Sequence, residues 1–101
     1  MKKTLVMWRD IPAQVIISRG RKKSKKILSE RFQKAIDRAA MIADRADSSD
    51  YLEDWHRVEE DLNSDKVIDQ LVELEASFLE TSYDDDRLER LIKAGGLHQK
   101  D

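Results

Sequence analysis

Apolar residues near the start of the chain alternate with polar ones or form short runs, a pattern typical of β-strands. Strands are expected over residues 4–10, 14–19 and 25–28. Pro12 favours a tight turn over residues 11–14, and a loop over residues 21–24 separates the second strand from the third. Because such short connections cannot make crossovers, we expect a three-stranded antiparallel meander.

From residue 30 onward the apolar spacing changes to three and four residues, which predicts helices. Ser29 is a suitable N-cap for a helix over residues 30–46. A second helix is expected to begin at residues 48–50. Its three turns would carry an apolar stripe made of Tyr51, Trp55, Val58 and Leu62.

Two further helices are expected in the C-terminal part. The third follows a start signal at residues 63–65 and is the most strongly periodic, from Val67 to Leu79. The fourth begins at the acidic triplet 84–86, which suits the positive end of a helix, and ends at Gly95-Gly96. The predicted fold class is therefore α+β in one domain: a β-meander over 3–28, about four helices over 30–94 and a tail over 95–101.

Composition limits the chemistry. The 101 residues suffice for one domain with a modest core, and charged residues make up 40%. The absence of cysteine excludes disulfides, iron–sulfur clusters and thiol nucleophiles. The longest apolar runs, 5–8 and 15–17, are too short for a membrane span, and the first is also too short for a signal peptide. We expect a cytoplasmic protein that does not enter the membrane.

The net charge of −2 conceals a division between the two halves. Residues 1–46 hold 13 Lys/Arg and 4 Asp/Glu, or +9, whereas residues 47–101 hold 6 and 17, or −11. The basic half could meet phosphate or an acidic protein, while the acidic half would repel nucleic acid. Alternatively, the two halves face and partly neutralise each other, within one chain or head to tail in a homo-oligomer.

Six cations within eight residues occupy the predicted tip between the second and third strands. Such a segment could bind phosphates and release counterions, which makes nucleic acid or another polyanion a candidate partner. The alternative is a solvated tip whose lysines protect an edge strand. The residues are Arg19, Arg21, Lys22, Lys23, Lys25 and Lys26.

No catalytic or metal-binding constellation stands out. His56 lies among Glu53, Glu59 and Glu60, but an exposed acidic helix face explains this cluster better than a metal site with converging ligands. The sequence has no nucleophile elbow, phosphate-binding loop or dinucleotide glycine pattern. We therefore expect no catalytic residues, no cofactor and no metal.

The string Trp8-Arg9-Asp10 combines an aromatic ring with an ion pair beside a turn proline. If exposed, a Trp–Arg pair is typical of the central contacts of protein interfaces, and Trp55 is a second aromatic anchor of this kind. Burial in the core and a role in turn geometry are the structural alternatives.

Three segments together resemble the small bacterial virulence factor family: residues 8–15 (WRDIPAQV), 31–40 (RFQKAIDRAA) and 51–55 (YLEDW). The resemblance extends over about residues 4–92, and similar sequence forms one domain of the larger staphylococcal conserved virulence factor C. It implies an effect on pathogenic traits but supplies no catalytic residues. It also implies an association with one-carbon metabolism, as an accessory subunit in tetrahydrofolate- or cobalamin-dependent methyl transfer.

These observations predict a non-catalytic protein-interaction or adaptor module. It would dock through Trp8, Arg9 and the basic hairpin on one side and through the acidic helices on the other. The alternative function is binding of nucleic acid or another polyanion through residues 19–26. Charge reversal of Lys22, Lys23, Lys25 and Lys26 would then lower both the affinity and its salt dependence.

Overall fold

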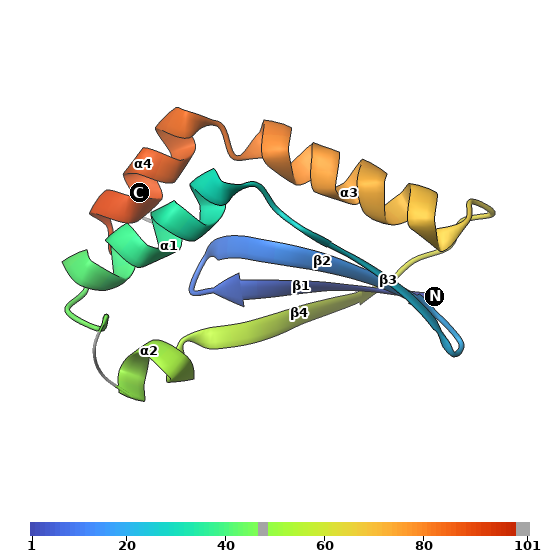
Figure 1. Ribbon diagram of the computed structural model, residues 1–101, viewed down its shortest axis with the longest axis horizontal. Helices are drawn as coiled ribbons and strands as arrows, with labels where there is room; N and C mark the ends of the chain where they lie inside the picture. Colours follow the sequence, from blue (N-terminus) through green and yellow to red (C-terminus); the bar gives the residue numbers. More distant parts are fainter. Residues whose placement is uncertain (47–48, 99–101) are drawn as a thin grey trace.

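The computed structural model describes residues 1–46 and 49–98, which form an α+β fold with a four-stranded antiparallel sheet in the order β3-β2-β1-β4 (Figure 1). The elements, in chain order, are β1 (Lys2–Trp8), β2 (Ile11–Arg19), β3 (Lys22–Ile27), α1 (Glu30–Ile42), α2 (Ser49–Glu53), β4 (Trp55–Asp61), α3 (Ile68–Ser82) and α4 (Asp85–Lys93). The expected N-terminal meander is confirmed.

The β1–β2 turn lies earlier than predicted. Trp8 pairs with Ile11, so the connection is Arg9-Asp10, and Arg9 adopts a positive φ of 52°. Pro12 lies inside β2 opposite Met7, directly beside a shift in the strand register. Because proline has no N–H to donate, such an irregular position suits it as well as a turn does.

The prediction of a three-turn helix over residues 51–62 is wrong. Only the short helix α2 is present there, and the chain then enters β4, which pairs antiparallel with β1 from Trp8↔Trp55 to Lys2↔Asp61. The helical spacing of Tyr51, Trp55, Val58 and Leu62 is therefore coincidental. The β1 backbone supplies a ladder of hydrogen bonds that a pattern confined to residues 51–62 cannot reveal.

The other expected helices are present with shifted ends. Helix α1 ends at Ile42 rather than at residue 46. Helix α3 begins at Ile68, one residue after the expected start of the periodic stretch, and its N-cap is Val67 rather than a residue of the start signal 63–65. Asp84 caps α4, because its side chain accepts a hydrogen bond from the Arg87 amide. Of the expected tail, residues 95–98 are described, and residues 99–101 lie outside the described part.

The core lies between β2 and the helices. Helix α3 packs on β2 and β3, and α1 packs on β2 and α4, so the helices gather at the β2–β3 side of the sheet (Figure 1). Among the side chains that are almost completely inaccessible to water are Trp8, Ile11, Val15, Ile17, Phe32 and Ile36. In contrast, β4 lies farthest from these helices, and six of its seven residues are exposed.

Within the described residues, no helix has the length and apolar character needed to cross a membrane.

Candidate interaction surfaces

Trp8 lies at the centre of the packing around the β1–β2 turn. Its side chain has no exposed surface, and its indole Nε1 donates a hydrogen bond to the carbonyl of Tyr51 at 2.9 Å. The Tyr51 ring lies 5.8 Å from the Trp8 ring, and Gly96 lies against the indole at Cζ3 and Cε3 of its six-membered ring. Trp8 thus joins the β1–β2 turn to α2 and to the segment after α4.

Arg9 and Asp10 bind the same segments through polar contacts. The Arg9 Nε donates to Asp54 Oδ2 at 3.1 Å, and its Nη1 donates to the Gly95 carbonyl at 3.0 Å. The Asp10 amide donates to the Gly96 carbonyl at 2.8 Å, while the Asp10 carboxylate accepts from the His98 amide at 2.6 Å. These contacts satisfy backbone groups that a tight turn otherwise leaves to water.

The structure therefore contradicts an exposed Trp–Arg pair. Trp8 is fully buried, and only 13% of the Arg9 side chain is exposed. Trp55 is half-buried, with its ring 6.2 Å from that of Tyr51. The Trp8, Arg9, Asp10 and Trp55 cluster holds the domain together, and a partner could reach only its rim.

The β2–β3 hairpin does place cations at an exposed tip, as the sequence predicts. The tip is shorter than expected, since β3 already begins at Lys22 after Gly20-Arg21. Arg19 is engaged within the domain, where its Nη2 donates to the carbonyls of Ser64 and Lys66. Lys26 pairs with Glu73 on α3 at 3.3 Å.

The remaining four cations of the hairpin are exposed and make no side-chain ion pair with a described residue: Arg21, Lys22, Lys23 and Lys25. Successive strand residues point to opposite faces, so Lys23 and Lys25 lie on the face away from α3. The free positive charge is thus spread over both sides of the hairpin.

A second surface lies on the outer side of α3. Leu74 and Phe78 are four residues apart and share one helix face, with 50% and 66% of their surface exposed. Val67, the N-cap residue directly before the helix, is 59% exposed. Glu73 pairs with β3 and Glu75 with β1, so Leu74 between them points away from the sheet. We call the face made by these three apolar residues the α3 outer face.

The amino-acid sequence of α3 carries apolar residues on more than one helix face, but the periodicity alone does not show which of these faces is exposed. The helix buries Ile68, Leu71, Val72, Ala76 and Leu79 against the sheet. Val67, Leu74 and Phe78 lie outside that face. A helix that is apolar on more than one face has either a buried environment or a second contact.

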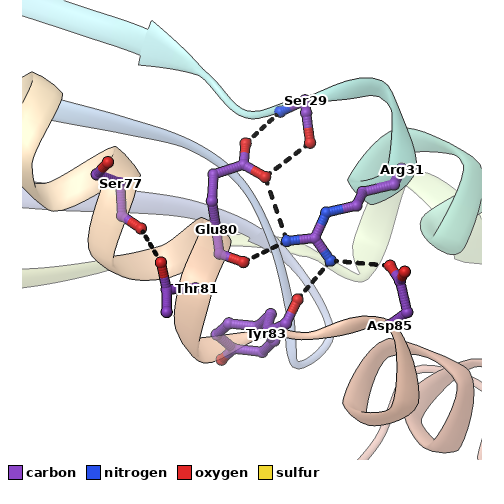
Figure 2. A network of polar contacts seen from close by, with 7 residues as sticks. All are labelled: Ser29, Arg31, Ser77, Glu80, Thr81, Tyr83 and Asp85. Carbon is purple, nitrogen blue, oxygen red and sulfur yellow. Dashed lines mark hydrogen bonds and ion pairs between the residues drawn. The ribbon is translucent and has the colours of Figure 1, made fainter.

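A polar network connects the start of α1 with the end of α3 (Figure 2). The Ser29 amide and hydroxyl each donate to a Glu80 carboxylate oxygen at 2.7 Å. Arg31 donates to the carbonyls of Glu80 and Tyr83 and pairs with the Glu80 carboxylate at 3.2 Å. Burial raises the pKa of Glu80, but the Ser29 hydrogen bonds and Arg31 outweigh it, so the pKa lies below its ordinary value of 4.5.

Replacing Glu80 with glutamine is expected to destabilise the domain by about 1–2 kcal/mol at pH 7, because Ser29 and Arg31 lose their charged acceptor. A carboxylate with a lowered folded-state pKa stabilises above its unfolded pKa, and this contribution is lost as the pH falls through the folded value. The difference between wild type and Glu80→Gln should therefore shrink below about pH 4.5. Urea unfolding at several pH values tests this.

Glu73→Gln is the matched control for that series. Glu73 lies on the same helix but is 62% exposed and pairs with one exposed lysine, so the expected change is below about 0.5 kcal/mol. Equal, pH-independent effects of the two variants would contradict the proposed role of Glu80.

The cluster around His56 differs from the one the sequence suggested. His56 lies on β4, and its Nε2 is 2.6 Å from the Arg9 carbonyl oxygen. Because residues 55–61 are a strand, Glu59 and Glu60 point to opposite faces and do not share a helix face with His56. The described residues contain no group of three or more His, Asp or Glu side chains able to hold a metal.

The fold and its surfaces define a small α+β domain with a buried aromatic turn, a basic hairpin and an apolar helix face. The chain belongs to the virulence factor family, whose family model matches residues 6–92. No curated protein and no solved structure gives a significant match. The matched range includes the β1–β2 turn and nearly all of the described strands and helices. Outside it lie only the first residues of β1 and the last residue of α4 among these elements.

Proposed function

We propose that this protein is a non-catalytic interaction module that docks another protein on the α3 outer face. The observation that carries the proposal is the exposure of Leu74 and Phe78, each at least half exposed on a helix that already packs on the sheet through another face, with exposed Val67 directly before the helix. Helices that present exposed apolar residues at i and i+4 are common contacts for partner proteins. Aromatic residues such as Phe78 are enriched in such interfaces.

The surroundings of this face indicate the chemistry of the partner. Beside Leu74, a shallow groove of about 410 Å³ is lined by Lys66, Asp69, Gln70 and Glu73. The exposed carboxylate of Asp69, which makes no ion pair with a described residue, favours a cationic group at the rim, while Leu74 and Phe78 favour apolar anchors. The expected partner is therefore a protein segment with apolar anchors flanked by Lys or Arg.

Polyanion binding through the basic hairpin is the second candidate function. It is supported by the exposed side chains of Arg21, Lys22, Lys23 and Lys25, which make no ion pair with a described residue. Reversing the charge of Lys23 and Lys25 would weaken such binding and reduce its salt dependence, because each lysine releases counterions. It should leave docking on α3 unchanged.

Docking on α3 is tested by co-purification from nuclease-treated native lysate with wild type, Phe78→Ser and the control Leu52→Ser. Leu52 is 70% exposed on α2, so its substitution removes a comparable apolar side chain elsewhere. We expect a stoichiometric partner with wild type and Leu52→Ser, and about thirtyfold weaker binding with Phe78→Ser. Both variants should remain folded because the replaced side chains are exposed.

The identity of the captured protein decides the pathway. A tetrahydrofolate- or cobalamin-dependent enzyme would support an accessory role in one-carbon metabolism, as the family resemblance implies, and a regulator would support a role in virulence. Equal capture by wild type and Phe78→Ser would overturn docking on α3. Recovery of nucleic acid in place of a protein would favour the basic hairpin.

A further inference from the structure

Strand β4 forms one edge of the sheet and has no neighbour among the described residues on its outer side. The strand order places β4 beside β1 alone, and Figure 1 shows its length free of any helix except α2 at one end. Exposed edge strands present unpaired N–H and C=O groups that can pair with another chain. Strand β4 is therefore available for such pairing over Trp55–Asp61.

The opposite edge, β3, is protected against pairing with a second copy of itself. Its sequence is Lys-Lys-Ser-Lys-Lys-Ile, so every antiparallel register that pairs at least three residues places lysine opposite lysine. Like charges directly opposite each other destabilise a strand pair. Strand β4 contains neither lysine nor proline, and its charged residues are of both signs, so a self-pair can place Arg57 opposite an acidic residue.

The hydrogen bonds at the two ends of β4 show which of its residues face outward. The Arg9 amide donates to the Asp54 carbonyl at 3.0 Å, and the Leu62 amide donates to the Met1 carbonyl at 2.9 Å. Antiparallel ladders use every second residue, so the even-numbered residues 54–62 direct their backbone groups to β1. The residues that direct N–H and C=O groups to the free edge are Trp55, Arg57, Glu59 and Asp61.

Strand β4 can form backbone hydrogen bonds with a second copy only where an outward-facing residue of one copy lies opposite an outward-facing residue of the other. Among the registers that meet this condition, the side-chain charges favour one. A two-fold axis at Val58 places Arg57 opposite Glu59 of the second copy, and Glu59 opposite its Arg57. The same register places His56 opposite Glu60 and Val58 opposite Val58. Moving the axis to residue 57 places Arg57 opposite Arg57, and moving it to residue 59 places Glu59 opposite Glu59. In the latter register Arg57 faces Asp61, but the like pair of glutamates at the centre disfavours it.

We propose that this protein forms a two-fold homodimer by antiparallel pairing of β4 with β4 of a second copy, centred on Val58. The two four-stranded sheets then become one sheet of eight strands. The interface is self-complementary, because each side contributes the same Arg57 and the same Glu59. This dimer does not depend on docking at α3, which packs on β2 and β3, away from β4.

The charges next to β4 are compatible with this pairing. Lys2 on β1 pairs with Glu59 at 2.9 Å, yet 49% of the Glu59 side chain stays exposed. Lys3 pairs with Glu60 at 3.1 Å, and 56% of that side chain stays exposed. In the dimer, each Glu59 therefore lies between its own Lys2 and Arg57 of the second copy, with cations on both sides.

A charge swap tests the dimer by sedimentation equilibrium of the full chain. Wild type should be dimeric, while Arg57→Glu and Glu59→Arg should each raise the dissociation constant about tenfold or more, because each opposes like charges at two symmetric positions. The double variant Arg57→Glu/Glu59→Arg should dimerise again. An equimolar mixture of the two single variants should also associate, because its two chains have complementary charges.

Lys23→Glu on β3 is the control, since it changes the net charge by the same amount as Arg57→Glu at the other edge. Circular dichroism of each variant verifies the fold. A monomeric wild type, or a dimer that Arg57→Glu leaves unchanged, would overturn the proposal, as would a double variant that stays monomeric while folded. Phe78→Ser should not alter the dimer, and Arg57→Glu should not alter capture at α3, so the two proposals fail independently.

Discussion

Replacing Gly96 with alanine is expected to lower the free energy of unfolding by about 2–5 kcal/mol. Gly96 has a φ of +93°, and a Cβ atom there would lie 2.8 Å from Cζ3 and 3.2 Å from Cε3 of Trp8. The positive φ costs an L-residue about 1–2 kcal/mol, and overpacking against a fixed ring adds about 1–3 kcal/mol. Chemical denaturation of wild type and variant measures the difference.

Gly20→Ala separates the two contributions. Gly20 has a φ of +58°, but a Cβ atom there would have no neighbouring atom within 4 Å, so only the backbone cost of about 1–2 kcal/mol applies. Gly96→Ala should therefore be clearly less stable than Gly20→Ala. If the two variants lose the same free energy of unfolding, close packing of the segment after α4 on Trp8 would be contradicted.

Replacing Trp8 with alanine is expected to cost about 3–5 kcal/mol, the range for deleting a buried large aromatic side chain. Trp8 is fully buried, and its Nε1 satisfies the Tyr51 carbonyl, which would lose its partner. Small domains are stable by about 5–15 kcal/mol, so this loss approaches the whole stability. Thermal unfolding followed by circular dichroism measures it.

Two further variants keep that prediction testable if Trp8→Ala does not fold. Trp8→Phe retains most of the ring volume but not the hydrogen bond, and should be intermediate. Trp55→Ala removes a half-buried ring and should cost less than Trp8→Ala. If Trp8→Ala lowers the free energy of unfolding by no more than Trp55→Ala does, the result would favour the surface role that the sequence suggested for Trp8.

The meander, α1, α3 and α4 were predictable because their signals are local. Alternating apolar residues mark β1 and β2, and Asp84 and Gly95-Gly96 mark the two ends of α4. Strand β4 was not predictable in this way. Its sequence, WHRVEED, buries no complete face, and it is a strand because the β1 backbone, distant in sequence, pairs with it.

Of the candidate site, the basic hairpin was predictable, the burial of Trp8 was one of two alternatives that the sequence left open, and the α3 outer face was missed. The basic hairpin is exposed as expected, because lysines at a hairpin tip have no apolar cover. The burial of Trp8 depends on Gly96, which is distant in sequence, and no pattern near Trp8 indicates it. The α3 outer face was missed because the periodicity of residues 67–79 does not distinguish a packed apolar side chain from an exposed one.

The contacts of Asp10 with Gly96 and His98 have a consequence for synthesis of the chain. The ribosome makes the β1–β2 turn well before the backbone that covers Trp8. During translation the packing around the indole therefore cannot be completed until residues 95–98 have emerged. A nascent chain that lacks residues 95–98 therefore lacks the backbone that covers Cζ3 and Cε3 of Trp8, so we expect the final packing of the aromatic core to follow synthesis of this segment.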